Sequence, residues 1–269
     1  MNELQYIALI PTTIFQILSS ISLSKHTYTP PRPYTHSFTI SKMPNDTPTT
    51  KATVLISGNG SNLQALIDAS RTTLPYLKIV RVISNRKTAY GLTRAKEADI
   101  PTTYHNLITG KYHTKDEKDA EVLQAARQKY DADLAGIVTA DEPDIVICAG
   151  WMHILAPTFL DPLAQKNIPV INLHPALPGR YDGAGAIQRA YDDFQAGKLQ
   201  DGKTGIMIHY VISEVDRGTP ITVREIECRE GESLEDLEQR IHGEEHELIV
   251  EGTSMAIIDL WAKRIHGKD

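Results

Sequence analysis

Short apolar runs alternate with amphipathic segments along the chain from residue 52 onward. The runs "ATVLIS", "LKIVRVIS" and "DIVICAG" are rich in β-branched residues, which is typical of strands. The segments "SNLQALIDAS", "GLTRAKEA", "KDEKDAEVLQAARQKY" and "AGAIQRAYDDF" carry apolar residues mostly three and four apart and predict helices. This repeated strand–helix–strand order predicts an α/β fold with a doubly wound, mostly parallel sheet.

Three shorter segments complete this part of the pattern. "PTTYH" predicts a brief strand, and "PVINLH" is largely apolar, as expected of a strand that is covered on both faces. "DADLAGIVTADEP" fits the alternation poorly. Both a loop and an extension of the preceding helix remain open for it.

The alternation changes after residue 204. "GIMIHYVIS" and "TPITVREIE" predict two strands, and the joining "EVDRG" predicts an antiparallel hairpin. A long C-terminal helix is expected next, with Ser233 as its cap and Asp236 three residues later. Its apolar stripe consists of Leu234, Leu237, Ile241, Leu248 and Ile249.

The first 50 residues have a different composition. Their apolar patches are interrupted by Gln5, Pro11 and Gln16 too often for a membrane span, and the following segment is rich in Thr, Pro and Ser. We therefore expect a disordered extension over residues 1–50 and one domain over residues 51–269. The accompanying hypothesis is that the extension adds no chemistry and that Met43 is the working start.

Composition narrows the class of function. The chain has 269 residues, a formal net charge of −6 and a pI of about 5.9, which argues against a general nucleic-acid binder. The two cysteines, Cys148 and Cys228, make neither a disulfide framework nor a zinc signature and suit a reducing compartment. We expect a cytoplasmic protein that binds small molecules and neither nucleic acid nor membrane. The oligomeric state is not predicted.

The first candidate site is the loop "GNGSN". Gly58 and Gly60 follow a predicted strand, and Ser61 and Asn62 open a helix. Glycines let a ligand approach the backbone closely, and the free N–H groups of a helix start attract anions. The third glycine of a dinucleotide fingerprint would fall at Leu63, so that motif is incomplete. A phosphate site and a simple capped turn both remain open.

The second candidate is the end of "VINLH". Alternate residues of a strand face the same way, so Asn172 and His174 point to one side. They sit at the carboxyl end of a parallel strand, where open α/β sheets bind their ligands. An amide and an imidazolium aimed at one point can hold a developing oxyanion. The simpler alternative is that both side chains bond to nearby loops.

The third candidate is Asp216, in the predicted hairpin turn "EVDRG". An aspartate in such a turn usually serves the backbone. Beside His174, it would instead raise the pKa of the histidine so that the ring is cationic near neutrality.

The fourth candidate is "HGEEH", residues 242–246, which matches the H-x-x-E-H pattern of some zinc peptidases. Gly243 within the predicted helix and the absence of other peptidase features argue against a zinc site, and we expect no metal. Glu245 lies along the apolar stripe of the helix and therefore needs either a core hydrogen bond or a polar ligand.

The ordered set "VLISGNGSNLQALIDA", "ICAGWMHIL", "INLHPALPG", "EVDRGTPI" and "HGEEHELIVEGT" resembles the phosphoribosylglycinamide formyltransferases, the folate-dependent enzymes of purine synthesis. The resemblance implies a Rossmann-like formyltransferase fold. It also implies transfer of a formyl group from the co-substrate 10-formyltetrahydrofolate to the amine of glycinamide ribonucleotide, with no metal.

The resemblance also implies residue roles. Asn172, His174 and Asp216 match the catalytic trio, while Gly60, Ser61, Asn62 and Glu245 match the residues that bind glycinamide ribonucleotide. The folate site would comprise Met152, His153, Ile154, Leu155 and Asn172, with Lys115 in the place of a basic residue near the folate tail.

Three alternatives share parts of this pattern. Methionyl-tRNA formyltransferase has the same trio but carries a further tRNA-binding domain, and formyltetrahydrofolate deformylase usually carries an N-terminal regulatory domain. A non-catalytic nucleotide- or folate-binding module would use the loops without the chemistry.

Overall fold

The computed structural model describes residues 48–266. The predicted extension lies almost wholly outside the described residues, and Met43 lies outside them. Among the residues that are described, no helix is long and apolar enough to cross a membrane.

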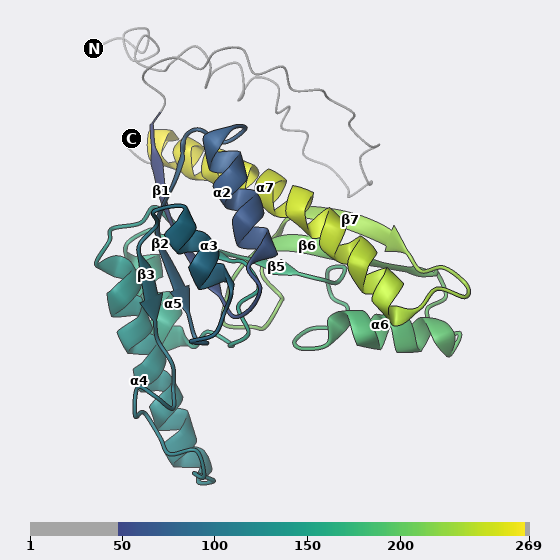
Figure 1. The fold of residues 1–269 in the computed structure, drawn as a ribbon, viewed down its shortest axis with the longest axis horizontal. Coiled ribbons are helices and arrows are strands. Elements are labelled where there is room, and N and C mark those ends of the chain that lie inside the picture. The colour runs from purple at the N-terminus through teal and green to yellow at the C-terminus, as the bar shows by residue number, and fades with distance from the viewer. Residues whose placement is uncertain (1–47, 267–269) are drawn as a thin grey trace, which may run out of the picture. The chain divides into compact units, whose positions relative to one another are not determined.

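A seven-stranded sheet forms the centre of the fold (Figure 1). Its strands stand in the order β3-β2-β1-β4-β5-β6-β7. The first five pair in parallel, and β6 and β7 are antiparallel. Their bounds are β1 Thr50–Ile56, β2 Leu77–Ser84, β3 Thr102–Tyr104, β4 Ile145–Cys148, β5 Val170–His174, β6 Lys203–Tyr210 and β7 Pro220–Glu227. The predicted mostly parallel sheet with an antiparallel hairpin at its end is confirmed.

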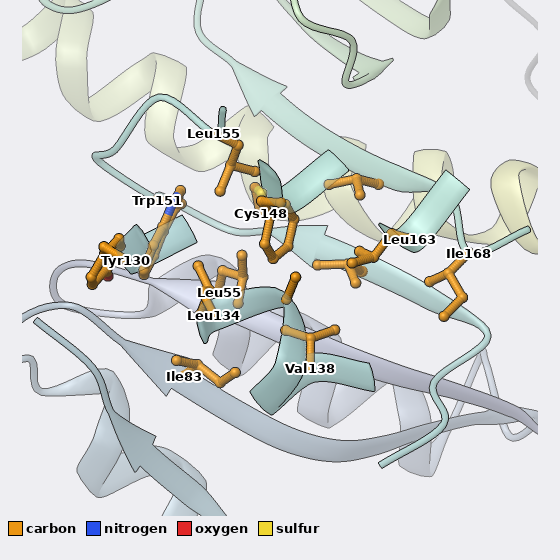
Figure 2. Packing of buried hydrophobic residues seen from close by; sticks show 14 residues of the cluster. Leu55, Ile83, Tyr130, Leu134, Val138, Cys148, Trp151, Leu155, Leu163 and Ile168 are labelled. Atoms are coloured by element: carbon orange, nitrogen blue, oxygen red, sulfur yellow. The ribbon is translucent and has the colours of Figure 1, made fainter. Parts of the chain in front are cut away.

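Helices cover both faces of this sheet. They are α2 Ser61–Arg71, α3 Gly91–Glu97, α4 Ala120–Thr139, α5 Pro157–Gln165, α6 Ala186–Gln195 and α7 Leu234–His266. Successive residues of β1 point to opposite faces. Leu55 belongs to the apolar cluster formed with α4 and α5 (Figure 2), whereas Ile56 points toward Gly91 at the start of α3. The sheet is therefore covered on both sides, as its apolar strands require.

Helix α4 differs from its predicted bounds. The pattern suggested a start near Lys115, but the helix begins at Ala120, because the Asp119 side chain caps it by accepting from the N–H groups of Glu121 and Val122. The segment left open between loop and helix is helical up to Thr139. Leu134 and Val138 continue the buried stripe of the helix in that segment, which explains the extension (Figure 2).

The start of α7 agrees with its predicted cap. The Ser233 hydroxyl oxygen accepts from the Asp236 N–H at 3.1 Å. The helix then runs for 33 residues and packs along α2, β6 and β7. This length carries its middle section past the carboxyl-end loops of the sheet, where Glu245 lies.

Candidate active site

Asn172 and His174 end β5, and their neighbours come from the antiparallel hairpin. In the strand register, Asn172 stands opposite His209 of β6, and His174 opposite Met207. The imidazole of His174 is buried. The turn between β6 and β7 then returns to the same edge of the sheet with Asp216.

The backbone fixes the position of Asp216. Its φ is +55°, in the left-handed region where Asp and Asn are the most tolerated residues after glycine. Its Oδ2 accepts from the Gly183 N–H at 2.7 Å. Two residues later, a Cβ on Gly218 would lie 1.6 Å from the Tyr210 carbonyl oxygen, so only glycine allows this close approach. The turn therefore serves the backbone and also presents a carboxylate.

The three residues predicted as a catalytic trio come together. His174 Nδ1 lies 3.4 Å from Asp216 Oδ2, and the Asn172 amide donates to Asp216 Oδ1 at 3.5 Å. The side-chain exposures of His174 and Asp216 are 5% and 10%, so this contact is shielded from water. An amide, an imidazole and a carboxylate at one strand end can move a proton and stabilise an oxyanion.

His209 is a fourth member of this cluster, and reasoning from the sequence missed it. Its Nδ1 lies 2.9 Å from the Tyr210 carbonyl oxygen, and its Nε2 lies 3.2 Å from the Asn172 amide nitrogen. The same Nε2 is 3.5 Å from Asp216 Oδ1. The signal in the sequence was a histidine within the apolar strand "GIMIHYVIS".

Asp216 acts on the pKa of His174 in the predicted direction, but its effect is not the largest one in the ligand-free protein. Burial lowers the pKa of His174, and the Asp216 charge, which acts to raise it, does not compensate, so the pKa lies below its ordinary value. The ring is therefore mostly neutral at pH 7. Its surroundings still suit a second proton, because Nε2 faces the Tyr181 carbonyl at 3.2 Å and Nδ1 faces Asp216.

Asp216 stays charged in this setting. Burial acts to raise the pKa of its carboxyl, but the contacts from His209, the Gly183 N–H and His174 together hold that pKa below its usual range. A carboxylate thus stands beside a neutral imidazole, and a proton arriving on His174 is stabilised at once.

The predicted phosphate loop and Glu245 meet at the start of α2. Gly60 occupies the N-cap position with φ +75°, and a Cβ there would lie 2.6 Å from Gly91 Cα. The Asn62 amide donates to Glu245 Oε2 at 3.0 Å, across 183 residues of sequence. Asn62 Oδ1 is buried with no hydrogen-bond partner among the described residues, which suits a site completed by a polar ligand.

Burial raises the pKa of the Glu245 carboxyl, and the Asn62 hydrogen bond and two nearby histidines oppose that rise only in part. Of the two histidines of "HGEEH", His242 is exposed and His246 has a buried Nε2 without a partner in the described part of the chain. No group of three or more His, Cys, Asp or Glu that could hold a metal ion occurs within residues 48–266. Through its hydrogen bond with Asn62, Glu245 faces the phosphate loop.

The predicted folate segment is the loop between β4 and α5. Met152 and Ile154 are 70% and 56% exposed, whereas Leu155 is buried in the apolar cluster (Figure 2). The Met152 N–H donates to the Ser57 hydroxyl at 2.8 Å, so the loop begins beside the end of β1. Its two exposed apolar side chains are available to a flat ring system.

Lys115, the predicted basic residue for the folate tail, makes no contact with the folate segment in the ligand-free protein. Lys115 is exposed in the turn before α4, with no hydrogen bond to the folate segment. Arg127 of α4 is closer to that segment, since its Nη2 is 3.5 Å from His153 Nδ1. The signal was its spacing, because Arg127 stands one helical turn before Asp131, which is the buried partner of His153.

Known proteins resemble this chain over most of its length. The family model described as "Formyl transferase" matches residues 50–253. A phosphoribosylglycinamide formyltransferase of Schizosaccharomyces pombe is 47% identical over 210 residues, which cover 77% of this chain and 96% of the relative. One of Saccharomyces cerevisiae is also 47% identical over 210 residues, 74% of this chain and 94% of the relative.

A solved structure shares the fold. The phosphoribosylglycinamide formyltransferase of Campylobacter jejuni superposes with a TM-score of 0.63 at 30% identity, covering 78% of this chain and 98% of that one. The residues matched by the family model include the loops and strands that carry the candidate site. On these grounds, the chain belongs to the formyl transferase family.

Proposed function

We propose that the chain transfers the formyl group of 10-formyltetrahydrofolate to the amine of glycinamide ribonucleotide, a step of purine biosynthesis. The observation that carries this proposal is the contact of His174 and Asn172 with Asp216, at the same edge of the sheet as the phosphate loop after β1 and the exposed folate segment after β4. The identity to phosphoribosylglycinamide formyltransferases supports the choice of substrates.

The phosphorylated substrate is assigned to the start of α2. The backbone N–H groups of Gly60, Ser61 and Asn62 lie at the positive end of the helix and suit a phosphate. Glu245, bonded to the Asn62 amide at 3.0 Å, offers its other oxygen to the glycinamide ribonucleotide. A substrate group that also reaches Asn62 Oδ1 satisfies the buried atom that lacks a partner.

The folate co-substrate is assigned to the Met152–Leu155 loop. The backbone N–H groups of His153, Ile154 and Leu155 make no hydrogen bond to another described residue, so they are available to the polar edge of a pterin ring. Arg127 rather than Lys115 is placed to meet the acidic tail, because it stands beside His153. Asn172, at the adjacent strand end, is the residue that meets the formyl group.

The reaction proceeds by attack of the substrate amine on the formyl carbon. The resulting tetrahedral intermediate carries a negative oxygen, which the Asn172 amide stabilises in place of its 3.5 Å contact with Asp216. Neutral His174 takes the proton that the amine nitrogen releases, and Asp216 stabilises the imidazolium. Collapse of the intermediate returns that proton to the folate nitrogen. These proton transfers require no metal and no covalent enzyme intermediate.

An assay of the purified chain with both substrates tests the proposal. We expect tetrahydrofolate to be released in proportion to formylated product, and only when glycinamide ribonucleotide is present. The matched control is Asp216→Asn, because asparagine tolerates the left-handed backbone at that position. We expect this variant to release tetrahydrofolate far more slowly. Release of tetrahydrofolate without the ribonucleotide would identify a deformylase. Activity only with methionyl-tRNA would identify a methionyl-tRNA formyltransferase.

A lack of product with an active reference enzyme would reject catalysis and leave a binding module. A stoichiometric zinc ion in the purified protein, removed together with activity by a chelator, would support the "HGEEH" alternative. For location, we propose the cytoplasm, because Cys148 and Cys228 are both free thiols, as suits a reducing compartment. Cell fractionation tests that assignment.

A further inference from the structure

We propose that Asp131, buried in α4, is a positioning residue that holds the Met152–Leu155 loop in the form that binds the folate. The inference rests on the proposed function, because it assigns that loop to the folate. Asp131 itself is 0% exposed and is covered by the loop, so it acts through the loop and not on the ligand.

The Asp131 carboxylate bonds the loop at two points. Its Oδ1 accepts from His153 Nε2 at 2.8 Å, and its Oδ2 accepts from the Ala156 N–H at 2.9 Å. Ala156 is the N-cap residue of α5, so the second bond fixes the exit of the loop. The Met152 N–H, bonded to the Ser57 hydroxyl at 2.8 Å, fixes its entrance.

Each donor around His153 faces an acceptor when the His153 ring carries a single proton. The Arg127 guanidinium, which can only donate, lies 3.5 Å from His153 Nδ1. That contact leaves Nδ1 as an acceptor and places the ring proton on Nε2, which faces Asp131. Arg127, His153 and Asp131 therefore form one directional chain from the surface to the buried carboxylate.

Aromatic residues pack around His153 and restrict the movement of its ring. Tyr130 meets the His153 ring edge to face at 5.0 Å between ring centres and stacks on His105 at 4.3 Å. The Tyr130 hydroxyl donates to the His105 carbonyl at 3.0 Å. Because α4 carries both Tyr130 and Asp131, the position of the loop is fixed by contacts with this one helix.

Stability alone is a weak reason for a buried carboxylate at this position. Removing such a charge from water costs several kcal/mol in order of magnitude, and apolar replacements are often as stable. A carboxylate that fixes a ligand loop has a further effect, because a preordered loop loses less conformational entropy when it binds. The exposed Met152 and Ile154 side chains and the free N–H groups of the loop then face the folate already arranged.

Steady-state kinetics of Asp131→Asn test this role. The variant keeps an acceptor for Ala156 but presents an amide N–H to the Nε2–H of His153. We expect the KM for 10-formyltetrahydrofolate to rise about tenfold to a hundredfold, the effect of losing a hydrogen bond to a charged group. The KM for glycinamide ribonucleotide should not change. The matched control is Asp133→Asn on the same helix, whose carboxylate accepts instead from the Tyr112 hydroxyl at 2.7 Å.

Hydrogen exchange of the ligand-free protein separates the inference from the proposed function. We expect faster exchange of the two hydrogen-bonded amides at the ends of the loop, Met152 and Ala156, in Asp131→Asn than in wild type or Asp133→Asn. His153→Ala, which keeps the Ala156 bond, serves if Asp131→Asn does not fold, and should show the same faster exchange. Equal rises of both KM values, or unchanged exchange in the loop, would overturn the inference. An inactive wild type would overturn the proposed function alone.

Discussion

His174 is subject to two opposing influences, and their balance decides its charge. Burial lowers its pKa and the Asp216 carboxylate acts to raise it, with burial the larger effect. We expect an NMR titration of the His174 ring in the ligand-free protein to give a pKa below about 6.5, the ordinary value. Asp216→Asn removes the charge that favours the imidazolium, so the pKa should fall further. A pKa that does not change in the variant would make Asp216 a turn residue only.

Glu245 is predicted to act on one substrate. Glu245→Gln keeps an oxygen to accept from Asn62 but removes the charge offered to the ribonucleotide. We expect a higher KM for glycinamide ribonucleotide and an unchanged KM for the folate. Because burial raises the pKa of this carboxyl, the wild-type KM for the ribonucleotide should also rise as the pH falls, starting above the ordinary range of a glutamate. Equal changes in both KM values would place Glu245 in the fold and not in the site.

The sequence pattern predicted some residues of the candidate site and missed others. Strand alternation predicted that Asn172 and His174 face one side, and the turn motif with the resemblance pointed to Asp216 as their partner; all three meet. His209 joins them only through the register of β6 against β5, which no local pattern contains. The sequence predicted that Gly60 lets a phosphate approach the backbone. In the structure, a Cβ on Gly60 would lie closest to Gly91, which begins a separate helix.

At the scale of elements, the close packing of α7 on β6 depends on one glycine. A Cβ on Gly252 would lie 2.6–2.8 Å from three Ile208 side-chain atoms, whereas one on Gly243 of the same helix would meet nothing within 4 Å. We expect Gly252→Ala to lower the free energy of unfolding by about 1–3 kcal/mol through overpacking. Gly243→Ala should raise it by about 0.5–1 kcal/mol, the usual helix preference for alanine.

Denaturant unfolding of the two variants measures both changes. If Gly252→Ala were as stable as Gly243→Ala, the packing described for α7 would be incorrect.

The elements themselves follow closely from periodicity, and their limits do not. The strands and the hairpin were predicted because each carries a short apolar run between turn residues. The extension of α4 remained open because "DADLAGIVTADEP" is weakly amphipathic on its own. Its helical state depends on Leu134 and Val138 packing in the cluster with α5 and the sheet, which is a tertiary effect (Figure 2).

For the whole molecule, the site consists of segments from distant parts of the sequence. The phosphate loop follows β1, the folate loop follows β4 and the catalytic residues end β5, so three parallel strands deliver them to one edge. The hairpin and α7 add Asp216 and Glu245 from the C-terminal part. The fold class predicted this common edge, whereas the contacts between α4 and the folate loop required the structure.

The family match, which begins at residue 50, bears on the N-terminal extension. We propose that residues 1–42 take no part in the reaction, since their sequence carries no periodic element. A chain that starts at Met43 should keep the kcat, both KM values and the melting temperature of the full chain. A clearly lower melting temperature would show that the extension contributes to the folded domain. Mass spectrometry of the native protein would show whether Met43 is its start.

We propose that His174 and Asp216 act as one unit in formyl transfer, and a double-mutant cycle in kcat is the most direct test. Asp216→Asn and His174→Asn should each lower kcat by about a hundredfold to a thousandfold or more, with smaller effects on KM. Residues that act as a unit give losses that do not add. We expect the double variant to be little slower than the slower single variant; a loss equal to the product of the two single losses would show that the two residues act independently.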